Sequence, residues 1–248
     1  MSRAIDARKT GLCSSCQGVE KCLLSFLNEE DWAIWKEMLV SKIFGKNDFV
    51  FLEDEKAEGL YMVCSGGIKL IKSSPGGQQQ ILSLVGPGGF CGFPPLISQR
   101  THFCTAQAIA RTELNFIPRD AFLDFLKKSP SFTFNLIDHL SSQLRLARLQ
   151  LQNFSCKTGR PRIADLLLWL GRDFGRPAAR GIEISFELSR ADLASMAGLT
   201  TETTIRILSS LRQEGLLEAG GPKRIVLLDP QRLSEISGSE EPFAFQGT

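Results

Sequence analysis

Three cysteines near the start of the chain are spaced closely enough to hold one metal group. They form the pattern Cys13-x2-Cys16-x5-Cys22 within a polar stretch of little periodicity. Thiolates bind zinc and iron–sulfur clusters, and one cluster needs four ligands. A zinc site usually shows a second Cys/His pair, and none follows this motif. The three sulfurs either bind a metal ion or a cluster, or they are surface thiols without a ligand.

Few other residues of the chain could do catalytic chemistry. The 248 residues include seven cysteines and two histidines, His102 and His139. An odd number of cysteines argues against a disulfide framework and for metal or redox use of some of them. A zinc-dependent or thiol-dependent enzyme would need more histidines, an HxE motif or a partnered CxxC pair. We therefore expect that the protein is not an enzyme.

Residues 188–208 have the pattern of a helix-turn-helix that reads DNA. Ser189 and Asp192 are spaced as in a capping box, which begins a helix. Gly198 stands where the tight turn needs a positive φ, and Thr200 is placed to cap the second helix. The N-terminal, outward face of that helix would enter the major groove. The residues expected on this face are Thr201, Glu202, Ile205 and Arg206.

The exposed residues of the second helix have distinct expected roles. Arg206 can donate to O6 and N7 of guanine, and Glu202 can accept from the amino group of cytosine. Because Arg206 follows Glu202 by one helical turn, we expect an ion pair that fixes both side chains. Ile205 can only contact a thymine methyl group or exclude water. The alternative is a solvated helix surface with an ordinary ion pair.

The segment after this helix predicts a wing that contacts phosphates. Two short strands are expected within 213–228, separated by the turn Gly220-Gly221-Pro222, with Lys223 and Arg224 at its tip. Residues 157–232 hold 12 Lys and Arg against 9 Asp and Glu, a net charge of +3, while the whole chain carries +2. This bias suffices for a few phosphate contacts and not for tight binding to any DNA.

The region before position 130 predicts an antiparallel β-roll between helices. Residues 29–44 place apolar side chains from Trp32 to Ile43 at helical spacing, which predicts a short amphipathic helix. From about 45 to 118, short apolar runs such as 60–63 and 68–71 alternate with glycine-rich turns, as in a barrel or roll. A second short helix is expected over 119–129.

A long helix follows, from Pro130 to Cys156, and it carries one uncharged apolar stripe. The stripe residues, spaced three and four apart, are Ile137, Leu140, Leu144, Ala147, Leu151 and Phe154. This spacing is that of a coiled-coil seam. At 1.5 Å per residue the helix is longer than the small roll needs, although a core helix of that domain is the alternative. We expect a homodimer that does not depend on a signal for its existence.

These elements predict an α+β protein with a fixed order of domains. The expected parts are a Cys-rich sensor segment over 1–28, the β-roll over 29–129, the dimerisation helix over 130–156, a winged helix-turn-helix over 157–236, and a disordered tail over 237–248. The hinge is expected at 157–161. The chain has no apolar run of about 18 residues and no secretion signal, which predicts a cytoplasmic protein that does not contact the membrane.

In this order, the elements resemble the CRP/FNR family of transcription regulators across nearly the whole chain. The segments that carry the resemblance are 60–69, 86–93 and the helix-turn-helix. It implies a homodimer that binds double-stranded DNA at a palindromic operator, with RNA polymerase as a further partner. Glu202 and Arg206 match the base-reading pair of the family, which implies a G·C pair in each half-site. Ile205 stands where FNR-like members have Ser, so the outer bases stay open.

The resemblance also bears on the ligand of the roll, which is similar to a cyclic-nucleotide-binding domain. Members that bind cyclic nucleotides have a Gly-Glu pair after the glycine-rich turn and an Arg-Ser pair at the next strand. This chain has Gly92-Phe93 and Arg100-Thr101 at those places. The carboxylate that would bind the ribose is missing, so we expect no binding of a cyclic nucleotide.

The cysteine motif is similar to that of the oxygen-sensing FNR branch, which carries a [4Fe–4S] cluster. The resemblance implies such a cluster here, responding to oxygen, nitric oxide or redox state. By register on 116–118, the fourth FNR cysteine falls at Asn115. If 104–110 and 112–117 formed a hairpin, residue 106 would face Asn115 and Cys104 would lie two residues away. Cys104 is therefore the predicted fourth ligand, and Cys91 is its main rival.

The remaining candidates have simpler interpretations, and two rival functions stay open. Cys64 and Cys156 are interpreted as packed or surface cysteines, and His102 as a surface histidine. One rival is a regulator that senses a haem-bound gas or a small ligand in the roll, with the cysteines as a thiol redox switch. The other is an adaptor that binds only proteins. For the cluster hypothesis, we expect that loss of the cluster reorients the DNA-binding domains within an intact dimer.

Overall fold

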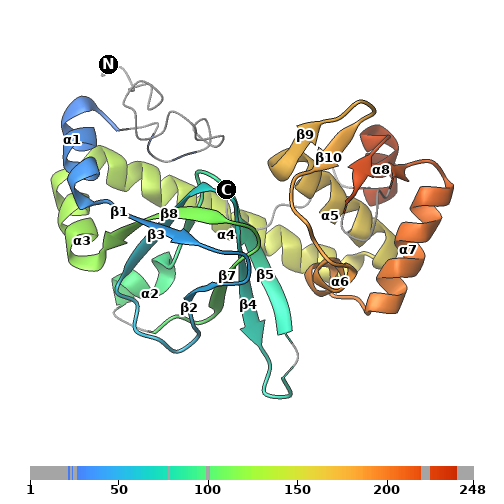
Figure 1. Ribbon diagram of the computed structural model, residues 1–248, viewed down its shortest axis with the longest axis horizontal. Coiled ribbons are helices and arrows are strands. Elements are labelled where there is room, and N and C mark those ends of the chain that lie inside the picture. The colour runs from blue at the N-terminus through green and yellow to red at the C-terminus, as the bar shows by residue number, and fades with distance from the viewer. Residues whose placement is uncertain are drawn as a thin grey trace. The chain divides into compact units, whose positions relative to one another are not determined.

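The computed structural model describes residues 22, 24, 27–77, 79–98, 101–218 and 224–238 (Figure 1). The chain divides into two compact units. Their described residues are, for the first unit, those up to Lys72 and Leu84–Gln143, and for the second unit Ser73–Ser83 and those from Leu144 onward. Strands and helices occur in both units, which confirms the predicted α+β class. None of the described helices is long and apolar enough to cross a membrane.

Two four-stranded sheets form the roll, as the alternating apolar runs predict. Sheet A has the order β1-β8-β3-β6, and sheet B has the order β2-β7-β4-β5. The strands are β1 (Val40–Phe44), β2 (Phe49–Phe51), β3 (Gly59–Ser65), β4 (Ile68–Ser73), β5 (Gln79–Val85), β6 (Phe90–Cys91), β7 (Thr105–Ala108) and β8 (Thr112–Pro118). Within sheet A the pairings are antiparallel, and Leu60 lies opposite Ile117.

Helices pack on the outer face of sheet A around one tryptophan. These helices are α1 (Glu29–Met38), α2 (Phe93–Ser98), α3 (Arg119–Lys128) and the start of α4 (Pro130–Cys156). The Trp35 ring is fully buried, with its centroid 5.2 Å from that of Phe125 and 5.4 Å from that of Phe132. The Trp35–Phe125 pair is edge-to-face, a geometry that is favourable beyond the buried area alone. Asp31 accepts a hydrogen bond from Ser129 (Oδ2–Oγ 2.6 Å), which fixes α1 against the α3–α4 junction.

The predicted helix over 29–44 is wrong in its second half. The helix ends at Met38, and the chain continues as β1 with Val40 opposite Phe116 of β8. Ile43 lies on this strand and is 60% exposed, so its place in the helical pattern was coincidental. Ladder hydrogen bonds to β8 and the β-branched residues of this stretch favour the strand, which a helical periodicity of apolar positions cannot reveal.

The long helix α4 begins and ends where the sequence predicts, and its apolar stripe is not covered. Among the stripe residues, Ile137, Leu140, Leu144 and Leu151 are 37–68% exposed in this single chain. Ala147 and Phe154 are half-buried. Uncovered large apolar side chains at coiled-coil spacing indicate a surface that is buried by a partner. The interpretation as a core helix of the roll does not hold for these residues.

The second unit is a winged helix-turn-helix around a helical core. Its elements are α5 (Gly159–Phe174), β9 (Gly175–Pro177), β10 (Ile182–Ile184), α6 (Arg190–Ala197), α7 (Thr201–Gln213), β11 (Leu217–Glu218), β12 (Val226–Leu227) and α8 (Pro230–Ser237). The strands form one sheet in the order β11-β12-β10-β9. Ile163, Leu166, Leu167 and Leu170 are buried beside the fully buried Trp169. The fold class predicted from the sequence is confirmed.

Candidate nucleic-acid interface and sensor cysteines

The first helix of the helix-turn-helix begins and ends as the sequence predicts. Ser189 and Asp192 form a reciprocal capping box, with Ser189 N–H donating to Asp192 Oδ2 (2.9 Å) and Asp192 N–H donating to Ser189 Oγ (3.0 Å). Gly198 ends α6 with φ +62°, a conformation that glycine adopts without strain. A Cβ at Gly198 would also lie 3.1 Å from the Phe154 ring, so the turn fits closely against the end of α4.

The second helix, α7, presents the predicted reading residues to solvent. Thr200 caps it by accepting from Thr203 N–H (3.2 Å), and Thr204, Leu208 and Leu211 are buried beneath it. The four predicted readers, all exposed, are Thr201, Glu202, Ile205 and Arg206. The expected ion pair between Glu202 and Arg206 is not formed between these two described side chains. Arg206 Nη2 instead contacts Thr203 Oγ1 at 3.5 Å, which leaves its guanidinium accessible to a base.

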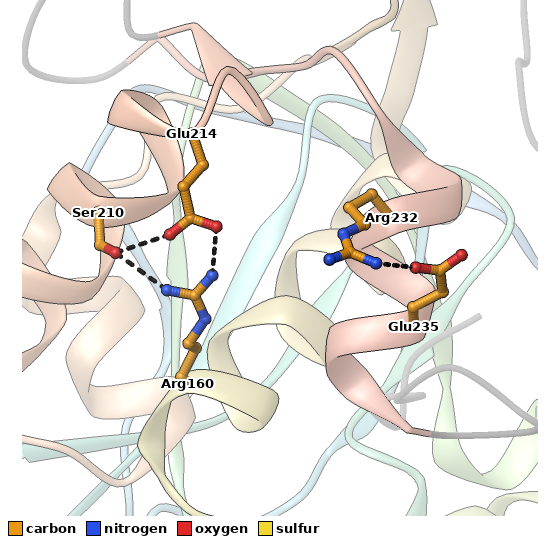
Figure 2. Close-up of polar contacts among 5 residues, drawn as sticks. All are labelled: Arg160, Ser210, Glu214, Arg232 and Glu235. Atoms are coloured by element: carbon orange, nitrogen blue, oxygen red, sulfur yellow. Dashed lines mark hydrogen bonds and ion pairs between the residues drawn. The ribbon is translucent and has the colours of Figure 1, made fainter.

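A charged cluster anchors the far end of α7 to the start of α5. Figure 2 shows Arg160 reaching Ser210 Oγ (2.9 Å) and Glu214 Oε2 (2.6 Å), with Ser210 Oγ also donating to Glu214 Oε1 (2.9 Å). These hydrogen bonds lower the pKa of Glu214, with Arg160 as the main cause. A separate ion pair joins Arg232 and Glu235 on α8 (Figure 2). The reading helix is therefore held by polar contacts at the end opposite its readers.

A second arginine, Arg162, clamps the turn between α6 and α7. Its guanidinium donates to the carbonyl oxygens of Ala197 (3.2 Å) and Gly198 (3.4 Å), and to that of Lys157 (3.1 Å). It also lies over the Phe154 ring, 5.8 Å from its centroid. These contacts fix the helix-turn-helix to the hinge residues that follow α4. The sequence interpretation had not singled out Arg162, although it opens the amphipathic part of α5.

The wing is described in part. Its strands β11 and β12 pair antiparallel, as predicted, and Lys223 lies outside the described residues. Arg224 is exposed and pairs with Glu183 of β10 (Nε–Oε1 2.6 Å), so a phosphate would compete with this carboxylate. The pairing raises the pKa of Arg224 through a side-chain hydrogen bond.

Arg190 is a candidate contact that sequence reasoning missed. It lines a small open cleft, together with Ile205 and Arg212 of α7 and Glu218 of β11. Its Nη1 atom is buried without a hydrogen-bond partner in the part of the chain that the structure describes, and burial lowers its pKa. Arg190 thus brings a guanidinium with one unsatisfied, buried donor to the cleft between the reading helix and the wing. The signal in the sequence was an arginine at the first helical position after a capping serine.

Of the three motif cysteines, the structure describes one. Cys13 and Cys16 lie outside the described residues, and Cys22 is 5% exposed in the aromatic cluster on sheet A. The described residues alone contain no group of three His, Cys, Asp or Glu side chains that could hold a metal ion. Cys22 packs in one cluster with Phe132 and Leu136, which belong to the first turns of α4. The end of the motif is thus built into the core that leads to the long helix.

The hairpin on which the assignment of Cys104 depended is wrong. β7 does not pair with β8, because Ala106 lies opposite Phe51 of β2 and Leu70 of β4 in the other sheet. Cys104 is buried, as are Ala106 and Ala108 at alternate positions, so these residues face the interior of the roll. Burial raises the pKa of the Cys104 thiol to about 11. The short connection from β7 to β8 carries the chain from sheet B to sheet A, and a local sequence pattern cannot reveal this change of sheet.

The other predictions around the roll have mixed outcomes. His102 is buried and stacks on Phe51 with ring centroids 3.7 Å apart, so its interpretation as a surface histidine is wrong. Cys91 is buried opposite Tyr61, and burial raises its pKa. Cys156 is exposed at the end of α4, as a surface cysteine should be. Phe93, which replaces the expected carboxylate, begins α2, and Arg100 lies outside the described residues.

Asn115, where the register placed the fourth FNR cysteine, contacts another sulfur. Its side-chain amide donates to Cys64 Sγ, with 3.1 Å between Nδ2 and the sulfur. Asn115 is buried on β8 opposite Met62, and Cys64 follows on β3 at a register shift between Val63 and Ser65. Cys64 is partly buried and packs against the same cluster as Cys22.

Comparisons with known proteins match both units. The Crp-like helix-turn-helix domain matches residues 161–236, and the cyclic nucleotide-binding domain matches residues 41–129. The chain is 30% identical to the cyclic AMP receptor protein of Thermus thermophilus over 79% of this chain and 87% of that protein. It is 27% identical to the anaerobic regulatory protein of Pasteurella multocida over 92% of this chain and 83% of that protein. The structure of FixK2 from Bradyrhizobium japonicum is similar with a TM-score of 0.73, 28% identity, and coverage of 82% and 99%.

Proposed function

Because the chain belongs to the CRP/FNR family of DNA-binding transcription regulators, we propose that it regulates transcription under the control of an iron–sulfur cluster. The cluster is held by the N-terminal cysteines and responds to oxygen, nitric oxide or redox state. The observation that carries this proposal is the position of Cys22. Cys22, the third cysteine of the closely spaced motif, is buried in a group of packed apolar side chains that also contains Phe132 and Leu136 of α4.

The residues present fit such a group. Cys13, Cys16 and Cys22 offer sulfur donors, the ligand type that iron–sulfur clusters use. The apolar neighbours of Cys22, which include Trp32 and Trp35, exclude water from its side of the site. When bound, the cluster would supply a redox-active group that oxygen or nitric oxide converts or destroys. The name of the Pasteurella relative, an anaerobic regulatory protein, supports a signal of this class.

Changes at the motif can reach the long helix through direct packing. If Cys22 loses its bond to iron, its side chain would repack among Trp35, Phe132 and Leu136. Two of these residues begin α4, whose uncovered stripe would form the dimer seam. The far end of α4 leads through Lys157 to the turn that Arg162 clamps. Loss of the iron–sulfur cluster would therefore change the orientation of the two α7 helices within an intact dimer.

The DNA-reading part of the proposal assigns roles to the exposed side chains of α7. Arg206 reads a guanine, Glu202 accepts from a cytosine, and Thr201 and Ile205 set the neighbouring bases. Lys223 and Arg224 of the wing contact phosphates, and Arg190 does so from the cleft beside α7. A dimer would place two such helices on a palindromic operator, about 34 Å apart. We propose no role for a cyclic nucleotide, because Phe93 stands in place of the ribose-binding carboxylate.

Anaerobic purification tests the sensing part of this proposal. We expect a brown protein with broad absorption near 400 nm, about four iron and four sulfide ions per chain, and DNA binding that changes on exposure to oxygen. Colourless protein without iron would contradict the cluster. A sharp Soret band would instead favour haem in the roll. Loss of the absorption without any change in DNA binding would remove the cluster from the regulatory mechanism.

A further inference from the structure

The last cysteine of the N-terminal motif lies on one defined face of the roll. Cys22 belongs to a single apolar cluster with Leu60 and Met62 of β3 and Ile117 of β8. The same cluster includes Phe125 of α3, so it fills the space between sheet A and the helices that cover its outer face. A fourth cysteine ligand must lie on this outer face if it is to bind the same iron–sulfur cluster as Cys22.

Cys64 is placed on this outer face. It packs against the apolar cluster of side chains that contains Cys22, and it is only partly buried. Cys64 lies where the register of β3 shifts against β8, between Val63 and Ser65. Such bulges re-aim side chains and occur often beside functional sites. The buried Asn115 amide aims its N–H at Cys64 Sγ from 3.1 Å.

The other described cysteines outside the motif lie elsewhere. Cys91, opposite Tyr61, and Cys104, beside buried Ala106, face the interior of the roll on the opposite side of sheet A from Cys22. Burial raises the pKa of both thiols, which opposes the thiolate form that binds metal. Cys156 ends α4 in the second unit. Only Cys64 among these four shares the face of Cys22.

We propose that Cys64 supplies the fourth thiolate of the cluster, completing the set of Cys13, Cys16 and Cys22. This assignment rests on the proposed function, and it replaces Cys104. On binding, the Cys64 thiol gives up its proton as its sulfur bonds to iron. Asn115 then acts as a positioning residue, because its amide N–H faces the ligating sulfur. Hydrogen bonds to ligating sulfurs tune the reduction potential of a cluster.

Metal content of matched variants tests this assignment. Wild-type protein, Cys64→Ala and Cys104→Ala are loaded anaerobically with ferrous iron and sulfide, and iron and sulfide per chain are measured after gel filtration. We expect Cys64→Ala to retain less than about a tenth of the wild-type iron, since even changes behind a ligand cost about 10–100-fold in metal affinity. Cys104→Ala should retain the wild-type amount. Far-UV circular dichroism of each variant checks that the fold is kept.

A measurement on the unaltered protein avoids any loss of folding. Loaded and iron-stripped wild-type chains are treated anaerobically with iodoacetamide, and alkylation of each cysteine is read by mass spectrometry. Cys64 should be protected at least about tenfold in the loaded protein, while the exposed Cys156 reacts equally in both as an internal control. Equal alkylation of Cys64 in both forms, or full iron in Cys64→Ala, would overturn the assignment and leave the cluster itself standing. Wild-type protein that binds no iron would overturn both.

Discussion

The two functional ends of this chain are held by different forces. The reading residues of α7 are exposed, and polar contacts fix their helix, through Arg160 to Ser210 and Glu214 and through Arg162 to the turn before it. Cys22 of the proposed sensor is buried, and the apolar side chains that surround it are packed rather than hydrogen-bonded. A helix that contacts DNA bases must keep its orientation both in water and on DNA, and directional hydrogen bonds fix that orientation. A sensor that must respond to a change at one sulfur suits packing that can rearrange.

The largest loss of stability is expected from a change in the apolar side chains that surround Cys22. Trp35→Ala removes the fully buried ring around which Phe125 and Phe132 pack, and we expect it to destabilise the first unit by about 3–5 kcal/mol. Chemical denaturation followed by circular dichroism measures this change. Ile34→Ala, on the exposed side of the same helix, is the matched control and should cost far less. Equal destabilisation by the two variants would argue against a core built on Trp35.

A buried ion pair in the second unit should show a comparable loss of stability when one partner is removed. Lys157 Nζ lies 2.5 Å from Asp165 Oδ2, and the carboxylate side chain is fully buried. Lys157→Met would leave that charge uncompensated, which costs about 3–5 kcal/mol for buried pairs. Because the lysine is 15% exposed, we expect the lower end of this range, measured by urea denaturation. The double variant Lys157→Met with Asp165→Leu should recover most of the loss, and failure to recover would contradict the pair as its cause.

The reading face itself should respond in affinity and not in stability. Arg206→Ala removes a proposed bidentate contact to guanine, worth about 1–3 kcal/mol, so the Kd for a palindromic duplex selected by the wild-type protein should rise roughly 5- to 150-fold for each half-site. Fluorescence anisotropy at fixed salt measures it. Arg111→Ala, exposed in the turn between β7 and β8 of the first unit, removes the same charge elsewhere. Identical Kd values for the two variants would remove Arg206 from the interface.

The smallest effect is expected from acid titration of the α7 anchor. Arg160 lowers the pKa of Glu214, so the pair stabilises the fold above the ordinary glutamate pKa of about 4.3 and is lost as the pH falls through the lowered value. Both side chains are more than a third exposed, so the contribution is small. Glu214→Gln should therefore be less stable than wild type at pH 6, with a difference that shrinks toward pH 3. A difference that stays constant over this range would contradict the assignment.

Local signals in the sequence were sufficient for the DNA-binding unit. The capping box of Ser189 and Asp192, the positive φ of Gly198 and the cap at Thr200 each depend on neighbours within a few residues. The exposed reading face follows from these boundaries because helical periodicity then fixes which side chains point outward. Arg190 and Arg162 were missed, since their contacts come from segments about 15 to 35 residues away.

The sensor site was harder to predict because its pairings are distant in sequence. Cys104 was placed by assuming that adjacent strands form a hairpin, whereas Ala106 pairs with Phe51 and Leu70 of sheet B. Because the chain passes from sheet B to sheet A after β7, strand β8 pairs with β3. This pairing brings Cys64 beside Asn115, which is 51 residues later. His102 was also misplaced, since its stacking on Phe51 depends on this arrangement. The spacing of Cys13, Cys16 and Cys22 is visible in the sequence. Only the fold indicates that Cys64 lies on the same face of the roll as Cys22.

If one iron–sulfur cluster controls DNA binding, the affinity for DNA must change when the cluster is lost. Anaerobic, iron-loaded protein is titrated with a fluorescent palindromic duplex, exposed to oxygen until the absorption near 400 nm is lost, and titrated again at the same salt concentration. Site-to-site couplings of about 1–3 kcal/mol correspond to changes of roughly 5- to 150-fold, so we expect the Kd to change by at least about fivefold while light scattering still reports a dimer. The same Kd before and after loss of the iron–sulfur cluster would contradict control of DNA binding by that cluster.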